Sequence, residues 1–246
     1  MSANQNKIAL VTGASRGIGR AIAEKLSEDG YTVIINYSGN VVSAEETVET
    51  IKAKGGNAIA IQADISNEND VARLFSDTMR LMGKLDVVIH SAGIMPLAKI
   101  TPDGLAEFDK VINTNLRGAF LVLANSAEHI VNGGRIVALT TSVIAKSFPT
   151  YGPYIASKAG VEGLIHVLAN ELRGRNITVN AVAPGPIGTD LFFNGKNEDQ
   201  IAAIAKLSPL ERIGTPEEIA NVVSMLVSKE GDWINSQIIR VNGGFA

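Results

Sequence analysis

The sequence predicts an α/β protein with a doubly wound, three-layer fold around a mainly parallel sheet of seven strands. Short apolar, β-branched runs alternate with longer amphipathic segments along the 246 residues, which is typical of a parallel sheet with helices on both faces. The short runs are apolar at successive positions, as strands covered on both sides require. A turn with three glycines joins the first run to the first helical segment, as in the opening unit of such folds.

The predicted elements follow one another without a Pro/Ser-rich linker or an internal repeat, so we expect one domain over residues 1–246 with right-handed crossovers. Apolar and β-branched runs predict strands at residues 8–11, 32–35, 58–61, 86–89, 135–139, 177–182 and 237–241. Helical periodicity predicts helices near residues 17–29, 41–54, 67–82, 104–130, 153–173 and 215–228. The irregular stretch after residue 184 is long for a connection and carries Phe192 and Phe193, so we expect a lid within 184–210.

The composition is that of an ordinary globular protein, with 46% hydrophobic and 19% charged residues. No stretch approaches the roughly 18 consecutive apolar residues of a membrane span. Residues 1–7 are too polar and too short for a signal peptide. We therefore expect a cytoplasmic protein that does not bind membranes.

Charge, cysteine and histidine content exclude several kinds of chemistry. The net charge is −3 and the Lys and Arg residues are scattered, whereas nucleic-acid binding requires clustered basic groups. The chain has no cysteine, which excludes disulfides, thiolate catalysis and Cys-bound zinc. His90, His129 and His166 lack metal-ligand spacing, so we expect no metal site.

The segment Thr12–Gly19 lies between a predicted strand and a predicted helix, which is the context that a dinucleotide-binding loop requires. A diphosphate lies against backbone N–H groups at a helix N-terminus, where unpaired donors and the helix dipole favour negative charge. Side chains at the three glycines would obstruct the turn, the phosphate or the helix packing. The alternative is an ordinary glycine-rich turn. The predicted binding residues of this loop are Gly13, Ser15, Arg16, Gly17, Ile18 and Gly19.

Ligands of a doubly wound fold bind beyond the carboxyl ends of the strands, so residues that follow the other predicted strands are also candidates. They are Asn36, Tyr37, Ser38, Asp64, Ile65, His90, Ser91, Ala92, Gly93, Thr140, Thr141, Ser142 and the segment 184–189.

Tyr154 and Lys158 are four residues apart in a predicted helix, so their side chains lie on one face. A nearby cation stabilises a phenolate and lowers its pKa from about 10. Tyr154 can then exchange a proton with a carbonyl oxygen. The alternative is a surface pair without a role in catalysis.

Ser142 follows a predicted strand and lies 12 residues before Tyr154, a distance that a loop can fold back across. A hydroxyl donor at this place polarises the same carbonyl. Thr141 beside it can take the same role, or either hydroxyl can simply cap a local turn.

Together these residues resemble the short-chain dehydrogenase/reductase family, in its shorter, single-domain form, over nearly the whole chain. The matching residues, in chain order, are Thr12-Gly13-x-x-x-Gly17-x-Gly19, Asp64, Ala92-Gly93, Asn115, Ser142, Tyr154-x-x-x-Lys158, Asn180 within 179–185, and Val241-Asn242-Gly243-Gly244.

The resemblance implies a Rossmann-type fold and a role for each residue of the site. Tyr154 would be the acid/base, Lys158 would bind the nicotinamide ribose and tune Tyr154, and Asn115 would hold a water in a proton relay. Ser142 would orient the substrate oxygen, and our preference for it over Thr141 comes from this resemblance. The hydride would come from the cofactor.

The resemblance also implies which residues contact each part of the cofactor. It places adenine at Asp64 and Ile65 and nicotinamide at Ile187 and Thr189. The remaining expected contacts are Ser91, Ala92, Gly93, Tyr154, Lys158, Pro184 and Gly185.

We expect NADP(H) as the cofactor. An NAD enzyme normally has an acid about 20 residues beyond the glycine turn, and Asn36-Tyr37-Ser38 contains none. Asn36 and Ser38 can donate to a 2′-phosphate and Arg16 can pair with it.

The chain departs from the family pattern at two places. His90 and Ser91 stand where the family usually has two asparagines, and we expect His90 to pack at a strand end rather than act in catalysis. The spacing from Ser142 to Tyr154 is also one residue shorter than is commonest.

Within the family, the chain looks most like 3-oxoacyl-carrier-protein reductases and related carbonyl reductases. An acidic carrier protein needs a basic surface near the site, for which Arg173 and Arg175 are candidates on one helix, but residues 126–132 contain no Lys or Arg. A reductase of free ketones is therefore favoured, with a pocket drawn from Ile94, Met95, Leu97, Phe148, Phe192 and Phe193.

Two other functional classes fit the sequence less well. A non-catalytic NADP(H) sensor can lack Tyr or Lys, and this chain has both. A sugar-nucleotide epimerase or dehydratase needs a larger substrate domain than 246 residues allow. The resemblance implies a homotetramer, and the C-terminal apolar residues suit a core or an interface equally.

Overall fold

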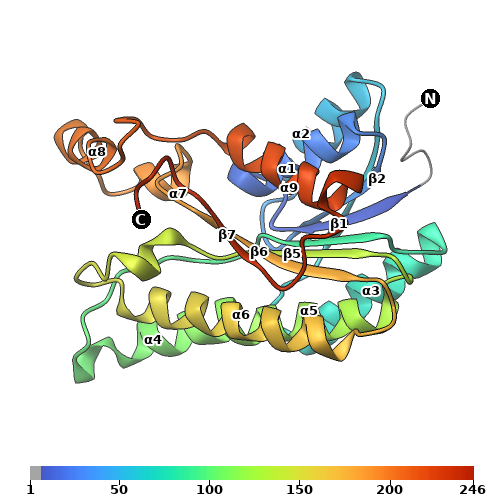
Figure 1. The fold of residues 1–246 in the computed structure, drawn as a ribbon, viewed down its shortest axis with the longest axis horizontal. Coiled ribbons are helices and arrows are strands. Elements are labelled where there is room, and N and C mark those ends of the chain that lie inside the picture. Colours follow the sequence, from blue (N-terminus) through green and yellow to red (C-terminus); the bar gives the residue numbers. More distant parts are fainter. Residues whose placement is uncertain (1–6) are drawn as a thin grey trace.

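A computed structural model describes residues 7–246 as a seven-stranded parallel sheet covered by helices (Figure 1). Its strand order is β3-β2-β1-β4-β5-β6-β7, and every adjacent pair is parallel. The predicted doubly wound fold is therefore confirmed. Residues 1–6, which include most of the segment assessed as a signal peptide, lie outside the described residues. The strands are β1 (Ile8–Thr12), β2 (Thr32–Tyr37), β3 (Asn57–Gln62), β4 (Val87–His90), β5 (Arg135–Leu139), β6 (Thr178–Pro184) and β7 (Ile238–Val241).

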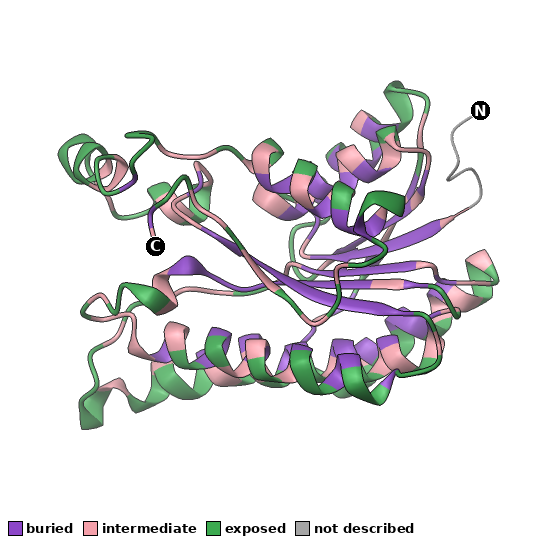
Figure 2. Ribbon diagram, in the orientation of Figure 1, coloured by how far each residue is buried: buried purple, intermediate pink, exposed green. Residues whose placement is uncertain are grey.

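Two hydrophobic cores lie on opposite faces of the sheet, because successive strand residues point to opposite sides. Leu10 belongs to the core with α3 (Glu68–Met82), α5 (Gly118–His129) and α6 (Gly152–Glu171). Its neighbour Val11 belongs to the core with α1 (Gly17–Glu28), α2 (Val41–Ala53) and α9 (Pro216–Val227). Figure 2 shows the buried strands between the two helical layers.

The helix predicted over residues 104–130 is interrupted. It consists of α4 (Leu105–Val111), the π-helical segment η2 (Ile112–Arg117) and α5. Three short 3₁₀ turns also occur, at η1 (Pro102–Gly104), η3 (Ser142–Ala145) and η4 (Lys229–Gly231). The π-helical segment matters for function, because such segments change the hydrogen-bond register of a helix and are frequent at functional sites.

The expected lid region contains two short helices that the sequence analysis did not predict, α7 (Asp190–Phe193) and α8 (Glu198–Ala205). A capping box formed by Asn197 and Gln200 starts α8. No residue of α8 is buried, and the helix stands away from the sheet in Figures 1 and 2.

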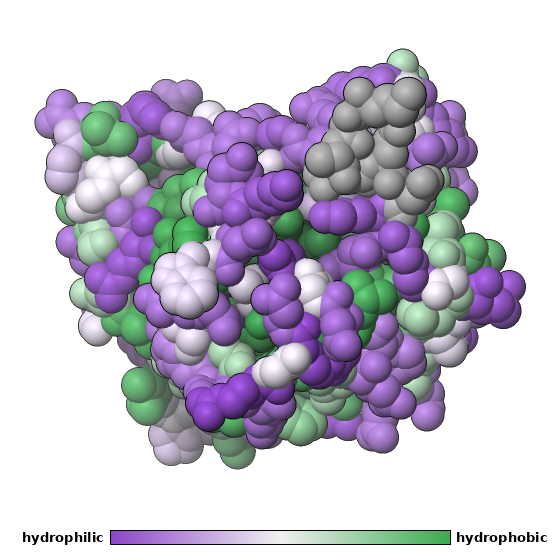
Figure 3. All heavy atoms as spheres, turned by 45° about the vertical axis from the view of Figure 1, so that its right-hand side comes forward, coloured by the Kyte–Doolittle hydropathy of each residue, from purple (hydrophilic) through white to green (hydrophobic). Residues whose placement is uncertain are grey.

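The strand order places the site. The order reverses between β1 and β4, which is where ligands bind in open α/β sheets. No helix within residues 7–246 has both the length and the apolar character needed to span a membrane. On the face seen in Figure 3, hydrophilic side chains predominate and hydrophobic ones form separate groups.

Candidate active site

The glycine turn forms a cradle with no room for side chains. Gly13 has φ +64°, and a Cβ there would lie 2.8 Å from the Cα of Ala92. A Cβ on Gly19 would lie 2.3 Å from the Gly13 carbonyl oxygen. The remaining glycine of the turn, Gly17, faces Thr189 of the loop after β6, and a Cβ on Gly17 would lie 3.4 Å from Thr189 Cγ2. The glycine loop and the loop after β6 therefore enclose one site.

The start of α1 is open to an anion. Its N-cap residue Arg16 makes no side-chain capping bond within the described part of the chain, and the first turn carries no acid. Backbone N–H groups at such an N-terminus attract phosphate. These residues therefore fit the diphosphate of a dinucleotide.

Thr12 and His90 hold the floor of this cradle. The Thr12 hydroxyl oxygen accepts bonds from the N–H groups of Ser91 (3.1 Å) and Ala92 (3.2 Å) and lies 3.0 Å from His90 Nδ1. With two N–H donors on its oxygen, Thr12 donates its own proton to Nδ1, so the ring proton of His90 is on Nε2. Nε2 is buried without a hydrogen-bond partner among residues 7–246.

His90 is fully buried, and this burial, with repulsion from Lys158, lowers its pKa to about 3. It is neutral at physiological pH and packs at the end of β4, where we predicted it.

Asn36 does not have the role that we expected for it. Its amide is buried, and Nδ2 donates to the carbonyls of Ile61 (3.3 Å) and Ala63 (3.1 Å), while Oδ1 accepts from Gly13 N–H (3.4 Å). The side chain therefore braces the glycine turn against β3 instead of donating to a phosphate. Arg16 and Ser38 are exposed at this end of the site.

The two residues expected at adenine differ in exposure. Asp64 is half-buried, and its Oδ1 accepts from the Ser66 N–H (2.9 Å) and hydroxyl (2.8 Å). Ile65 is buried and packs against Gly118.

Asn115 lies in η2 and is fully buried. Its amide pairs with the backbone of Ile94 in both directions, at 2.8 Å each, and Nδ2 also donates to Ser157 Oγ (3.2 Å). A Cβ on Gly93 would lie 3.2 Å from Asn115 Oδ1 and 3.5 Å from Lys158 Nζ. The structure thus brings Asn115, Gly93 and Lys158 together.

Lys158 is buried, and its ammonium donates to the Leu139 carbonyl at 2.7 Å. Burial lowers the pKa of Lys158 to about 8. Burial also raises the pKa of Tyr154 to about 12, although a hydrogen bond with Thr141 opposes the shift. This is opposite to the direction that we expected from Lys158, because the loss of solvent around the phenol is the largest effect on it.

The two hydroxyls after β5 have different partners. Ser142 Oγ donates to the Ala183 carbonyl (2.8 Å) and accepts from Asn242 Nδ2 (2.9 Å). Thr141 Oγ1 accepts from Val143 N–H (3.2 Å) and hydrogen-bonds Tyr154. The sequence analysis named Asn242 only within the closing Val-Asn-Gly-Gly segment and gave it no role at the site. Its place in that segment was the available signal.

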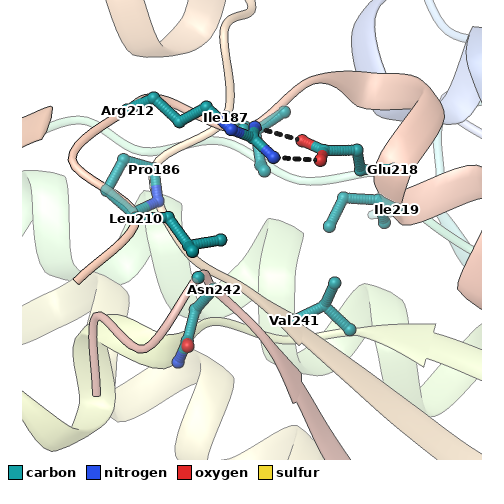
Figure 4. Close-up of a pocket in the computed structure, with 10 residues that line it drawn as sticks. Pro186, Ile187, Leu210, Arg212, Glu218, Ile219, Val241 and Asn242 are labelled. Atoms are coloured by element: carbon teal, nitrogen blue, oxygen red, sulfur yellow. Dashed lines mark hydrogen bonds and ion pairs between the residues drawn. The ribbon is translucent and has the colours of Figure 1, made fainter. Parts of the chain in front are cut away.

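The loop after β6 runs beside a pocket of about 210 Å³ (Figure 4). Ile187 is buried, and the bond from Gly188 N–H to the Gly214 carbonyl (2.9 Å) fixes the loop. Arg212 binds both carboxylate oxygens of Glu218, at 2.8 and 2.6 Å, on one side of this pocket. Thr189 caps α7 by accepting from Phe192 N–H. Pro184 is buried, and Gly185 packs against Asn242.

The aromatic residues predicted for the substrate pocket separate into two groups. Phe148 packs with Phe245 and Tyr151, at ring-centroid distances of 6.1 and 5.9 Å. Phe192 and Phe193 pack with each other at 5.4 Å. Of the remaining predicted residues, Ile94 and Met95 are half-buried and Leu97 is exposed.

Arg173 and Arg175 do not lie on one helix, because α6 ends at Glu171. They follow the end of α6 opposite to Tyr154, and α6 has 20 residues, which corresponds to about 30 Å of helix. Arg175 also donates to the Ile130 carbonyl (2.6 Å) and to Asn132 (3.0 Å). Arg175 therefore braces the segment before β5, whereas Arg173 is exposed and bonds only Asn170 of α6 among the described residues.

Comparisons with known proteins give relatives over nearly the whole chain. A family model described as Enoyl-(Acyl carrier protein) reductase matches residues 13–246. A short-chain type dehydrogenase/reductase of Picea abies is 44% identical, covering 97% of this chain and 92% of that protein. A tetrahydroxynaphthalene reductase of Pestalotiopsis fici is 42% identical, with 97% and 91% covered. Among solved structures, an angucycline C-6 ketoreductase with bound NADP matches with TM-score 0.90 and 32% identity, over 98% of this chain and 96% of that chain.

Proposed function

This chain belongs to the short-chain dehydrogenase/reductase family, and we propose that it reduces a ketone to a secondary alcohol with NADP(H). The observation that carries the proposal is the buried ammonium of Lys158 beside Gly93 and Asn115, one helical turn along α6 from Tyr154. The related ketoreductase with bound NADP supports the same cofactor and reaction type.

Residues that follow β1, β4 and β6, with Lys158 of α6, would hold the diphosphate and nicotinamide parts of the cofactor. The N–H groups of Gly17, Ile18 and Gly19 would meet the diphosphate, and Ser91, Ala92 and Gly93 would line the floor. Lys158 would bind the nicotinamide ribose, with Ile187 and Thr189 at the nicotinamide. When bound, NADP(H) supplies the hydride to the carbonyl carbon.

Arg16 would set the preference for the phosphorylated cofactor. It is exposed at the cradle, and no acid follows β2 to repel a 2′-phosphate. Ser38 directly follows β2 and is exposed, and its hydroxyl would donate a further hydrogen bond to the 2′-phosphate.

Tyr154 would donate the proton. Its pKa of about 12 keeps the phenol protonated at neutral pH, as a proton donor for reduction must be. As the hydride reaches carbon, Tyr154 would protonate the oxygen, and the Lys158 ammonium would stabilise the phenolate that forms. Asn115 would hold a water that returns a proton through Lys158. Either Ser142 or Thr141 would orient the substrate oxygen.

A free ketone is favoured over a 3-oxoacyl group on a carrier protein, because Arg173 and Arg175 lie at the opposite end of α6 from Tyr154.

We further propose that α7 and α8 form the lid within 184–210. Limited proteolysis tests the lid: cutting near Phe193 should decrease when NADPH is added, and equal cutting would contradict it. A homotetramer in the cytoplasm also remains our proposal.

The deciding experiment is NADPH oxidation with a panel of ketones that includes a 3-oxoacyl thioester. We expect turnover of at least one free ketone, and loss of turnover with retained NADPH binding in Tyr154→Phe. A Tyr154→Phe variant with most of its activity would overturn the assignment. Turnover confined to the thioester would favour carrier-linked substrates, and cofactor binding without any turnover would favour a sensor.

A further inference from the structure

The pocket beside the loop after β6 lies on the α9 side of the sheet. Ile187, which lines it, belongs to the core formed with α1, α2 and α9, and Val241 packs against the same core. Tyr154 and Lys158 lie in α6, which covers the opposite face of the sheet (Figure 1). The pocket is therefore at a different place from the candidate catalytic residues and can hold a molecule of its own.

The lining of the pocket is mainly apolar (Figure 4). Ile187 and Ile219 form buried walls, whereas Leu210 is 60% exposed and Arg212 is exposed beside it. A molecule can therefore enter from solvent on the side of Leu210 and Arg212. The apolar side chains of the lining are Pro186, Ile187, Leu210, Ile219 and Val241.

Two charged side chains of the lining bind each other. Arg212 donates to both carboxylate oxygens of Glu218, at 2.8 and 2.6 Å, and Glu218 also accepts from Thr215 N–H at 2.9 Å. The hydrogen bond from Arg212 lowers the pKa of Glu218 to about 2, so the pair stays charged at physiological pH. A charged molecule would lose hydration in this pocket without gaining an unpaired ion of opposite sign among the described lining residues, which is costly.

The amide of Asn242, which also belongs to the lining, has its partners within the chain. Nδ2 donates to Ser142 Oγ (2.9 Å) and to the Ala246 carbonyl (2.7 Å), and Oδ1 accepts from Gly244 N–H (3.0 Å). The polar side chains of the pocket are thus already paired, and the ligand that fits is neutral and apolar.

The volume of the pocket sets the size of this ligand. An apolar cavity of about 150 Å³ holds a benzene molecule, and this pocket measures about 210 Å³. It therefore has room for one ring with a small substituent.

One wall of the pocket is the back of the loop that we expect at the nicotinamide. Gly188 N–H donates to the Gly214 carbonyl (2.9 Å), and Gly214 N–H donates to the Pro186 carbonyl (3.0 Å). The Ile187 side chain is pressed against this bridge, since a Cβ on Gly214 would lie 2.7 Å from Ile187 Cδ1. A molecule in the pocket gives this loop packing contacts on its back, and a ligand that favours this conformation of the loop also favours what binds to it.

We propose that this pocket binds a neutral, apolar molecule of one substituted ring, and that its occupancy strengthens NADP(H) binding through Ile187. The second part rests on the proposed contact of Ile187 with the nicotinamide.

Toluene and benzoate test the chemistry of the pocket, because they share a ring and differ by a methyl group against a carboxylate. Each is titrated into the full chain with labelled Ile, Leu and Val methyl groups. We expect toluene to shift the methyl signals of Ile187, Leu210, Ile219 and Val241 together, and benzoate to bind at least about tenfold more weakly. Absent shifts at these residues, or equal binding of benzoate, would overturn the proposed site.

Two tryptophan variants locate the binding. Figure 4 shows the Leu210 side chain directed into the pocket, so Leu210→Trp should fill it and abolish the toluene shift of Ile187. Leu207→Trp is the matched control, because Leu207 is also exposed (45%) and does not line the pocket. Retained NADPH binding shows that each variant is folded. Toluene shifts of Ile187 that persist in Leu210→Trp would place the ligand elsewhere and contradict the proposal.

The link to the cofactor is measured by NADPH fluorescence titration. Saturating toluene should lower the Kd for NADPH at least about fivefold, and saturating NADPH should lower the Kd for toluene by the same factor. Leu210→Trp should show no effect of toluene on NADPH binding. An unchanged or raised Kd for NADPH in wild type would overturn the link through Ile187. Absence of NADPH binding without toluene would instead be a failure of the proposed function.

Discussion

Lys158 and Leu139 are joined by a hydrogen bond of 2.7 Å, from a buried ammonium to the last carbonyl of β5. This bond holds the charge of Lys158 at the carboxyl edge of the sheet, one helical turn along α6 from Tyr154.

The first prediction is a pH dependence of reduction. Because the pKa of Lys158 is lowered to about 8, the ammonium loses its proton above this pH, and the Tyr154 phenolate then forms without its stabilising charge. We expect kcat at saturating NADPH to fall as pH rises through 8, measured between pH 6 and 10. In Lys158→Met, kcat should be low throughout and this pH limb should disappear. A constant wild-type rate up to pH 9.5 would contradict the prediction.

The same group gives a prediction for stability. Folded Lys158 releases its proton near pH 8, whereas the unfolded side chain retains it to about pH 10.5, so the unfolded state binds more protons in this window. Wild-type unfolding free energy should therefore rise relative to Lys158→Met between pH 8 and 10, as measured by urea denaturation. If the unfolding free energy of wild type instead fell relative to Lys158→Met as pH rises, the folded state would stabilise the charged form of Lys158, contrary to the prediction.

The second prediction concerns the tautomer of His90. The hydrogen bonds of Thr12 place the proton on Nε2, and burial keeps the ring neutral because its pKa is about 3. Nitrogen-15 NMR should show the neutral Nε2–H tautomer unchanged from pH 8 to pH 5. His129 and His166 provide internal controls, since each is less buried than His90. Titration of His90 near pH 6.5, or a proton on Nδ1, would contradict the hydrogen-bond assignment.

The third prediction separates two glycines with left-handed backbone. Gly13 (φ +64°) has no space for a Cβ, whereas Gly133 (φ +81°) has nothing within 4 Å of that position. Gly133→Ala should cost about 1 kcal/mol of stability and leave NADPH binding unchanged. Gly13→Ala should cost more and abolish NADPH binding, because the Cβ meets the backbone of Ala92. Calorimetry and fluorescence titration measure both, and wild-type cofactor affinity in Gly13→Ala would argue against the cradle.

The fourth prediction concerns cofactor preference. Arg16→Ala should raise the KM for NADPH at least about tenfold, because a charge-assisted pair with the 2′-phosphate is lost, and should leave the KM for NADH nearly unchanged. Arg20→Ala is a matched control, since Arg20 already pairs with Glu24 at 2.8 Å. If the two variants behave alike, or if wild type uses NADH and NADPH equally, Arg16 does not read the phosphate.

The strands were predictable to within two residues, because buried parallel strands carry an unmistakable run of apolar residues. The largest differences are at the carboxyl ends of β2 and β6, each of which continues two residues further than predicted. The two helices of the lid region were not predictable by the same means. They are four and eight residues long and bury no residue, so no apolar periodicity marks them. The π-helical segment could not be predicted either, because the residues of 104–130 favour helix throughout. Asn115 in this segment is held by long-range bonds to Ile94 and Ser157, which the local sequence does not reveal.

The residues of the site were predictable by position, whereas their hydrogen-bond partners were not. Asn36 lies near the carboxyl end of β2 as expected, but its amide turns inward, where Nδ2 donates to the carbonyls of Ile61 and Ala63. Ser142 likewise bonds Asn242, a residue 100 positions beyond it. Spacing along a sequence carries no information on such long-range partners.

The contact between Thr12 and His90 joins residues 78 positions apart, and three crossover connections of the chain lie between β1 and β4. Pairings of this range form slowly, since the chain loses loop entropy before the contacts reward it. The pocket that these residues line therefore requires β4 and cannot form from β1 and β2 alone. A bound dinucleotide would therefore stabilise the pairing of β1 with β4, because only the folded pocket binds it.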